Sequence, residues 1–324
     1  MNASRDAKGF TLVELIVVAA LLATVFGLVV GGLGRPNLGS SVRRSAQDFA
    51  SRLLAVQSRS LGRREGAALI VAPSSDNARL GTIVLDAVTP AWTNCSVAGG
   101  MPPVAPLATS ASVALTAGTP APAGAYKLRF QADNGGQVSP WFAFSAATGT
   151  SGTVAFRTSA GQTSGNTIWP RTADQARRAI IAAYPLPSVS GPEMAKLAAI
   201  DLRHSGVGED PGVANGYGRF EGLGSIAVAY EQVGRVGEVM RKVQESPTAA
   251  DQPIEPTGVI YFLFAPRADI LQNRNTLANP QNIWVAINPH TGRVTVAQNV
   301  SQTTEDTLAI QAAREKARAG SASK

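Results

Sequence analysis

An unbroken apolar run near the N-terminus constrains this chain more than any other feature. The run extends from Phe10 to Leu33 and contains 24 residues, of which only Glu14 is ionisable. As a helix it would be about 36 Å long at about 1.5 Å per residue, enough to cross a bilayer core of about 30 Å. We therefore expect a membrane-spanning helix over these residues.

Glu14 is the unusual residue of this run. A charge inside an apolar span costs at least about 2.5 kcal/mol and usually has a partner, so Glu14 predicts a functional contact with a cation. A secretory signal peptide is the alternative interpretation of the run. Its apolar region is typically about 7–15 residues long and precedes a small-residue cleavage site, so the length and the glutamate both argue against it.

The start of the run reads Lys8-Gly9-Phe10-Thr11-Leu12-Val13-Glu14. A Gly-Phe-Thr-Leu-Xaa-Glu pattern before an apolar run resembles the signature of type IV pilins and of type II secretion pseudopilins. In that family a prepilin peptidase cleaves after the glycine, the new N-terminal Phe is methylated, and the fifth mature residue is Glu. The resemblance implies cleavage after Gly9, methylation of Phe10, and pairing of Glu14 with the Phe10 amine of a neighbouring subunit during assembly.

Small residues recur at every fourth position of the same run. Such spacing lets helices approach closely in a membrane, although ordinary alanine and glycine usage explains the pattern about equally well. The residues of this candidate assembly face are Ala19, Ala23, Gly27 and Gly31.

The resemblance also implies the organisation of the whole chain. We expect an α+β fold in which a long N-terminal helix packs on a mostly antiparallel β head that is enlarged by insertions. The expected parts are a leader (1–9), a transmembrane and assembly helix (10–33), its amphipathic continuation (34–64), a β-rich extracytoplasmic head (65–300), and a C-terminal helix and tail (301–324).

The resemblance further predicts a single-pass protein of the inner membrane with a periplasmic head, assembled into a filament. Its partners would be the prepilin peptidase, other pilin or pseudopilin subunits and the membrane, with the secreted cargo left open. The charges do not show this orientation. Basic residues flank the span on both sides, Arg5 and Lys8 before it and Arg35, Arg43 and Arg44 after it, so the positive-inside rule is undecided or favours the reverse.

Residues from about Ser40 predict an amphipathic helix, because apolar residues recur at spacings of mostly three and four. We interpret the arginines on the opposite side as a solvated face. Residues 52–72, a helix end followed by a basic turn and an apolar strand, are similar to H-type pseudopilins and minor pilins. The apolar stripe consists of Val42, Ala46, Phe49, Leu53, Val56 and Leu61.

The rest of the chain predicts mostly short strands, and the sequence leaves open whether they form one sheet or two. We expect 97–125 to be a long loop or an insertion, Thr172 to open a capped helix ending near Ala183, and a final helix over 304–319 capped by Thr303 and Asp306. The expected strands are 67–72, 81–87, 126–131, 140–144, 153–157, 198–203, 225–230 and 258–265, and the clearest hairpin is 282–297.

The net charge is +7, or +6 after removal of the leader with Arg5, Asp6 and Lys8. The basic residues are spread along the chain, which favours an ordinary soluble surface over a polyanion-binding one. A DNA-binding minor pilin used in DNA uptake is nevertheless the second hypothesis. Its phosphate contacts would come from Arg171, Arg177 and Arg178.

Catalytic and metal-binding patterns are weak. His204 and His290 are the only histidines, and we expect both to be structural. Cys95 is the only cysteine, which we expect to be a partly buried thiol, with an intermolecular bridge left open. Residues 133–136 and 208–210 could offer oxygen ligands to calcium but are more typical of turns. We therefore predict no cofactor, no metal and no enzymatic activity, with a membrane-anchored enzyme as the least favoured alternative.

Overall fold

The computed structural model divides the chain into two units, residues 1–38 and 39–324. The described residues are 16–19, 38–89, 93–98, 110–116, 124–131, 139, 141–148, 151–155, 178–187, 194, 196–212, 217–243 and 253–319. The second unit is α+β with antiparallel pairing between its strands, as expected from the sequence.

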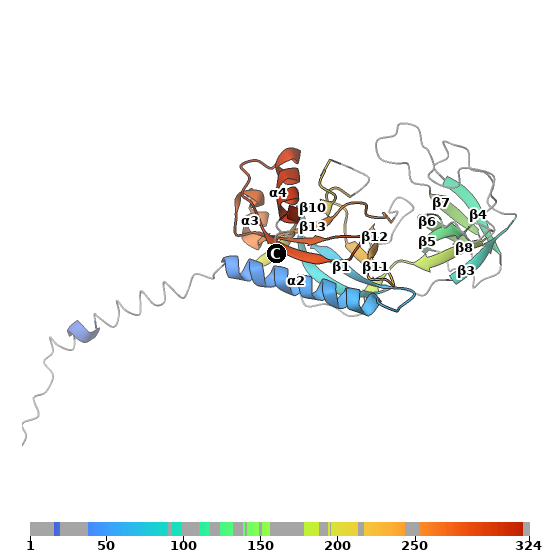
Figure 1. The fold of residues 1–324 in the computed structure, drawn as a ribbon, viewed down its shortest axis with the longest axis horizontal. Helices are drawn as coiled ribbons and strands as arrows, with labels where there is room; N and C mark the ends of the chain where they lie inside the picture. The colour runs from blue at the N-terminus through green and yellow to red at the C-terminus, as the bar shows by residue number, and fades with distance from the viewer. Residues whose placement is uncertain are drawn as a thin grey trace, which may run out of the picture. The chain divides into compact units, whose positions relative to one another are not determined.

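A nine-stranded antiparallel sheet forms the centre of the second unit (Figure 1). Its strands are ordered β12-β11-β1-β2-β10-β13-β14-β15, and the short β9 pairs with β2. Three neighbouring pairs in this order, β11–β1, β2–β10 and β10–β13, join strands that are far apart in sequence, so the sheet depends on long-range pairing. The strands are β1 (Ala67–Ser74), β2 (Asn77–Val88), β9 (Leu186–Pro187), β10 (Ala198–Val207), β11 (Ile226–Tyr230), β12 (Val236–Arg241), β13 (Ile260–Pro266), β14 (Ile283–Ile287) and β15 (Val294–Gln298).

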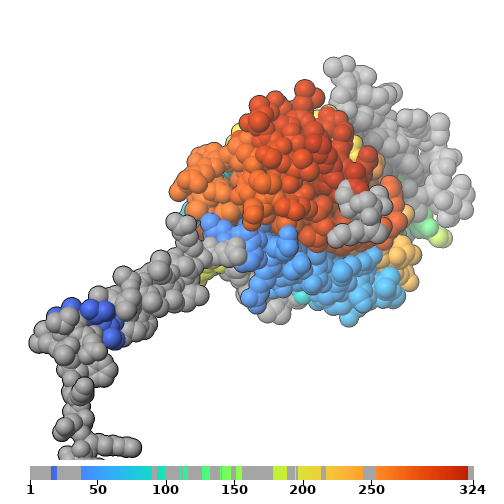
Figure 2. Space-filling view, turned by 60° about the vertical axis from the view of Figure 1, so that its left-hand side comes forward, coloured from blue at the N-terminus to red at the C-terminus, as the bar shows by residue number. Residues whose placement is uncertain are grey.

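Helix α2 (Leu38–Ser60) covers one face of this sheet. Its stripe from Val42 to Val56 is buried against alternate residues of the central strands, and the Phe49 ring lies 5.0 Å from that of Phe262 on β13. Figure 2 shows the blue helix lying against the orange and red C-terminal part of the chain. The predicted amphipathic helix and its packing on a sheet are therefore confirmed.

The opposite face of the sheet carries the C-terminal helices. Helix α4 (Thr307–Ala319) buries Ile310 and Ala313 against Trp284 of β14, and the short α3 (Arg267–Leu271) buries Ile270. A 3-10 turn, η2 (Thr276–Ala278), lies between α3 and β14. Period-two alternation in the strands makes this possible, because successive side chains face α2 and α4 in turn.

A closed six-stranded barrel is inserted between β2 and β10, in the order β3-β4-β7-β6-β5-β8. Its interior is apolar, with Leu128, Phe130 and Phe144 at its centre, and Cys95 lies among them as a buried free thiol. The sequence did not decide between one sheet and two, and the structure has a sheet and a barrel. The barrel strands are β3 (Thr93–Val97), β4 (Ser110–Thr116), β5 (Gly124–Gln131), β6 (Phe142–Thr148), β7 (Ser151–Ala155) and β8 (Arg178–Ala183).

Of two predictions on the inserted region, the first was right in part and the second was wrong. Residues 97–125 belong to an insertion, one of the two forms expected, but they are not a loop throughout, because they include β4 and the start of β5. Val113 of β4 points into the barrel core while its Ser and Thr neighbours give the strand little apolar signal. The predicted helix up to Ala183 is replaced by β8, in which the β-branched Ile180 and Ile181 are buried between β3 and β5. Its predicted start, 172–175, lies outside the described residues.

The ends of two predicted helices also differ. Helix α2 ends at Ser60, and Leu61 lies beyond it with 56% of its surface exposed, so this residue does not belong to the buried stripe. Gly62 follows with a φ of +77°, a left-handed conformation that ends a helix. Helix α4 begins at Thr307, and Asp306 alone caps it by accepting a hydrogen bond from the Ala309 backbone N–H.

The remaining strand predictions agree with the structure to within a few residues at their ends. The hairpin over 282–297 is confirmed as β14 and β15, which pair from Ile287–Val294 to Ile283–Gln298. Strands β3 and β12 were not predicted, and both are short and contain polar residues.

Candidate functional site

The residues predicted to take part in processing and assembly lie mostly outside the described part of the chain. Ala19 belongs to a described helical stretch, 16–19, in which all four residues are exposed. Among the described helices, none is both long and apolar enough to cross a membrane. The predicted roles therefore stay predictions for Gly9, Phe10, Glu14, Ala23, Gly27 and Gly31, which are not described.

The arginines of α2 face solvent, as predicted. The Nε of Arg52 donates to Asp48 at 3.2 Å, and Nη2 of Arg59 donates to Asp86 of β2 at 2.7 Å. Exposed ion pairs of this kind contribute at most about 1 kcal/mol each. This face is a solvated helix surface with local charge pairing.

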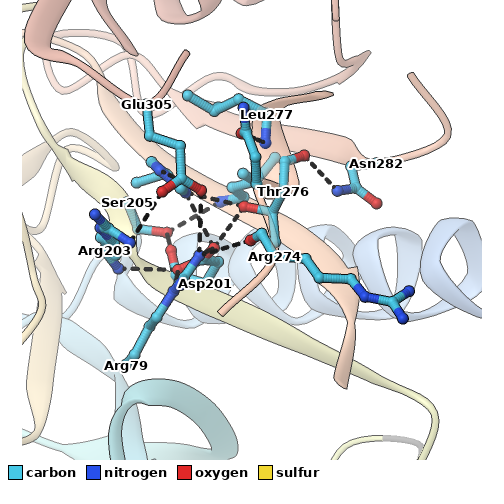
Figure 3. Close-up of polar contacts among 12 residues, drawn as sticks. Arg79, Asp201, Arg203, Ser205, Arg274, Thr276, Leu277, Asn282 and Glu305 are labelled. Carbon is cyan, nitrogen blue, oxygen red and sulfur yellow. Dashed lines mark hydrogen bonds and ion pairs between the residues drawn. The ribbon is translucent and has the colours of Figure 1, made fainter. Parts of the chain in front are cut away.

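A buried polar cluster connects four segments of the chain at the inner strands β2 and β10 of the sheet (Figure 3). We call Arg79 of β2, Asp201 and His204 of β10, Thr276 of η2 and Glu305 before α4 the hub. Arg79 donates from Nε and Nη2 to the two carboxylate oxygens of Asp201, at 2.9 and 2.7 Å. This two-bond geometry is the strongest form of an arginine–carboxylate pair.

His204 and Thr276 complete the partners of Asp201. The Nδ1 of His204 lies 3.0 Å from Asp201 Oδ2, and the hydroxyl of Thr276 donates to the same oxygen at 2.6 Å. The side chains of Asp201 and His204 are fully buried. The hub contains the residue types of a catalytic group, but Asp201 and His204 are closed to a substrate. This geometry agrees with the predicted structural role of His204.

The charge of Asp201 is maintained by these contacts. Burial by itself would raise the pKa of this carboxyl group, but the hydrogen bonds from Arg79 and His204 outweigh burial and hold the pKa well below its usual range. Asp201 consequently stays ionised inside the fold at neutral pH, where it joins β2, β10 and η2.

Arg314 anchors α4 to the same inner strand, β10. Its guanidinium is fully buried and makes four hydrogen bonds to backbone carbonyls. Two reach the carbonyl of His204, at 3.2 and 2.6 Å, and the others reach Gly208 and Gly218 at 2.9 Å. Burial lowers the pKa of Arg314 to about 9. The helix is therefore fixed by a buried cation as well as by apolar packing.

A pocket of about 250 Å³ lies where the barrel meets the β11–β12 hairpin. Two ion pairs line it. The Nζ of Lys127 contacts both oxygens of Glu238, at 2.9 and 2.7 Å, and Nε of Arg235 donates to Glu231 at 2.6 Å. Lys127 and Glu238 are both buried, and we call them the junction pair. The pair connects the outer surface of β5 to β12.

Trp141 strengthens this junction. The Nζ of Lys127 and the guanidinium carbon of Arg129 lie 4.5 and 4.7 Å from the centre of its ring, a favourable cation–π geometry. Burial lowers the pKa of Arg129, while burial and the nearby Glu238 raise the pKa of Glu255. Several titratable side chains therefore lie close together here. The acidic and basic side chains largely pair with one another, as is typical of a contact between two parts of a folded chain.

The other candidate residues are scattered. Arg178 is exposed at the start of β8, whereas Arg171 and Arg177 lie outside the described residues. His290 is exposed in the β14–β15 turn. Burial raises the pKa of the Cys95 thiol to about 11.

The candidate calcium turns show no metal-site geometry where they are described. Glu209 pairs with Arg318, and Asp210 accepts a hydrogen bond from the Gly212 backbone N–H at 2.7 Å, as in a turn. In the described part of the chain, no three His, Cys, Asp or Glu side chains are arranged so that they could hold a metal ion. Residues 133–136 are not described.

The comparisons with known proteins bear on the N-terminus. Residues 4–30 match the family described as the prokaryotic N-terminal methylation motif. This chain carries the prepilin-type motif of the type IV pilin and pseudopilin family. The motif implies processing by prepilin peptidase and assembly with other pilin subunits, as a structural subunit. Neither the curated proteins nor the solved structures gave a significant match to the chain.

Sequence reasoning about this prepilin-type chain missed both the hub and the junction pair. Arg79 and Asp201 are 122 positions apart, and Lys127 and Glu238 are 111 apart, so no local pattern joins them. The one available signal was a charge inside an otherwise apolar segment. Asp201 interrupts the run from Ala198 to Leu202, where a carboxylate needs a buried partner.

Proposed function

We propose that this protein is a minor pilin or pseudopilin, cleaved after Gly9 and assembled through its N-terminal helix into a type IV pilus or a type II secretion pseudopilus. The methylation motif over 4–30 carries the proposal. The proposed anchor is the apolar run from Phe10 to Leu33, and we propose that the folded unit lies outside the inner membrane, as the prepilin-type motif implies.

The size of the folded unit supports the proposal that this chain is a minor subunit of its filament. A barrel of six strands is added to the sheet between β2 and β10, which makes the unit large. The repeating subunit of a filament must fit against many copies of itself, whereas a subunit present once or at the tip can carry extra bulk. We therefore assign this chain to a minor or tip-proximal place.

The first test is the mass of the N-terminal peptide from membranes of cells with and without the prepilin peptidase. We expect a peptide that begins at N-methylated Phe10 only when the peptidase is present. An intact leader, or cleavage well beyond Leu33, would contradict the proposal.

Assembly is tested separately with Glu14→Gln. This variant keeps the cleavage site but removes the charge that would pair with the Phe10 amine, so we expect normal cleavage and at least a tenfold loss from sheared filaments. Asp6→Asn is the matched control, since it removes a carboxylate from the leader that cleavage discards. Equal amounts of both variants in the sheared filaments would contradict the assembly role of Glu14.

A further inference from the structure

The two outer strands of the nine-stranded sheet, β12 and β15, have different free edges. Along β12, Val239 exchanges both backbone hydrogen bonds with Ile254 at 2.9 Å, so this edge is partly covered. The strand also contains Glu238 and Arg241, and charged residues discourage the pairing of a further strand. No described strand pairs with the outer side of β15. Of the two outer strands, β15 therefore has the open edge.

The hydrogen bonds at the two ends of β15 show which of its backbone groups face outwards. The N–H of Asn288 donates to the carbonyl of Arg293 at 2.9 Å, and the N–H of Asn299 donates to the carbonyl of Asn282 at 2.8 Å. The pairing with β14 has no register shift between these points, so the odd-numbered residues of β15 direct their backbone groups to β14. The residues whose N–H and C=O groups point outwards are Val294, Val296 and Gln298.

The side chains of β15 leave this edge unprotected. The strand reads Val-Thr-Val-Ala-Gln, without a charged residue or a proline, and its pairing with β14 has no bulge. Charges, prolines and bulges are the usual means by which an outer strand avoids pairing with another chain. An open edge without them suits strand addition, in which the main-chain hydrogen bonds of an extended segment provide affinity.

Exposed apolar side chains lie beside the open edge, on the face of the sheet that α2 covers. Val296 is opposite Val285, which packs under α2, so Val296 is on the same face, yet it is 44% exposed. Leu54 is 50% exposed and lies on the flank of α2 that carries Gln57. The Gln57 side chain donates to the carbonyl of Thr291 in the β14–β15 turn at 3.3 Å. An added strand would therefore bury apolar surface as well as backbone groups.

We propose that the open edge of β15 is a strand-addition site for another prepilin-type subunit of the same filament. The inference rests on the proposed function, because the prepilin-type motif is what implies other pilin subunits as partners. The bound segment is extended and uncharged, and it has apolar side chains at alternate positions, which lie beside Val296 and Leu54. It extends the nine-stranded sheet by one strand.

The edge ends close to the start of α2, which the chain joins directly to the proposed assembly segment. Gln298 pairs with Ile283, and its side chain donates to the carbonyl of Pro280 at 2.9 Å. The next residue, Gln281, lies against Gly39 in the first turn of α2. A neighbouring subunit that is brought in by the N-terminal segment is therefore the partner that assembly supplies to this edge.

The direction of α2 argues against a second copy of this chain as the occupant. The start of α2 is next to Gln281, just before β14, and Gln57 near its end contacts the β14–β15 turn. Helix α2 thus runs in the direction opposite to β15. Two β15 strands paired antiparallel about a two-fold axis would direct the starts of their α2 helices in opposite directions, which does not suit two subunits anchored in one membrane.

Val296→Lys tests the open edge in cells that make the filament. The lysine places a charge where the added strand would bury apolar surface. We expect at least tenfold less of this variant than of the unaltered protein in sheared filaments. Its N-terminal peptide should still begin at N-methylated Phe10, and the purified full-length variant in detergent should keep the melting temperature of the unaltered protein. Val233→Lys is the matched control, since this valine is 71% exposed in the β11–β12 turn, and we expect normal incorporation.

The outcomes separate this inference from the proposed function. If the unaltered protein lacks N-methylated Phe10 or is absent from the filaments, the proposed function fails and the inference fails with it. If the unaltered protein is incorporated and Val296→Lys is incorporated equally well, only the strand-addition site is overturned. An equal loss of both lysine variants also overturns it, because the effect is then not specific to the edge.

A photocrosslink tests the same site in a chain that keeps Val296. p-Benzoylphenylalanine replaces Gln298, an exposed residue at the end of the edge, and in a control chain it replaces Val233. After irradiation of the cells, we expect a crosslink only from position 298, to a different protein whose mature N-terminus is methylated as in prepilin-type subunits. A crosslink to a second copy, to residues of the same chain or to a protein without the motif would overturn the proposal, as would the absence of a crosslink.

Discussion

Asp201 is a fully buried carboxylate in the middle of a sheet, and it is tolerated because each oxygen has a donor. Arg79 binds both oxygens, while His204 and Thr276 share one of them. A buried ion pair of this kind adds little net stability compared with apolar packing, but removal of one partner leaves the other charge unsatisfied. Asp201 therefore fixes how the three segments are arranged, while its net contribution to the free energy of unfolding is small compared with that of apolar packing.

Asp201→Asn should show this asymmetry. At pH 7 we expect the variant to lose about 3–5 kcal/mol of unfolding free energy, because Arg79 stays buried without its charge partner. The pKa of Asp201 is lowered in the fold, so its contribution is fully present above the unfolded value of about 3.9 and is lost as the pH falls below it.

Urea unfolding at pH 7 and at about pH 3 measures the difference. The difference in unfolding free energy between the unaltered protein and the variant should be smaller at the lower pH. Asp76→Asn, an exposed carboxylate near the β1–β2 turn, serves as the control. A difference in unfolding free energy that stays constant or increases on acidification would contradict the role assigned to Asp201.

At the scale of elements, the junction pair decides how β5 of the barrel meets β12 of the sheet. Lys127 and Arg129 are on the outer surface of β5, since Leu128 and Phe130 fill the barrel interior. Glu238 supplies the matching charge from β12. The contact is therefore charged on both sides, in contrast to the apolar contact between α2 and the sheet.

A charge exchange tests the junction pair. We expect Lys127→Glu or Glu238→Lys alone to place like charges together and to raise the rate of proteolysis in the segments that join the barrel to the sheet by at least tenfold. The double exchange restores an opposite pair and should recover most of the resistance. Equal cleavage of the single and double variants would show that the pair does not hold the contact.

Helix α2 and the β14–β15 hairpin could be predicted because their signals are local. Phe49 and Leu53 recur at helical spacing, and residues 288–293 have clear turn chemistry. Strands β4 and β8 could not be predicted with the same rules. Alternation in β4 is hidden by small residues, and β8 is defined by its neighbours β3 and β5 rather than by its own sequence.

At the scale of the molecule, the barrel is an insertion whose two ends meet. The end of β2 pairs with β9, Ala87 with Pro187 and Val88 with Leu186, so the chain leaves the sheet and returns to it at one point. The clusters under α2 and under α4 contain no barrel residues, and a third cluster on the sheet takes only Tyr184, just after β8, from the inserted segment. The barrel should therefore be removable.

We expect excision of residues 89–185, with Val88 joined to Leu186 by an Asn-Gly turn, to leave the sheet folded. A two-residue turn of this kind suits paired strand ends. Hydrogen exchange on the purified full-length variant should show protection in β10 and β13 within about tenfold of the unaltered protein, since the large buried cluster under α2 is intact. Collapse of protection in these strands would contradict the independence of the sheet.

The pairing of β2 with β9 and β10 also sets an order of events as the chain emerges residue by residue. Strands β1 and β2 can form a hairpin at once, but the partner of β1 on its other side, β11, follows more than a hundred residues later. Until then, both edges of that hairpin present open hydrogen-bonding groups. A barrel that folds before β11 is synthesised would bring β9 back to β2 and shorten the effective loop between β2 and β10. Strand β9 would then cover part of the open edge of β2 until the remaining strands are made.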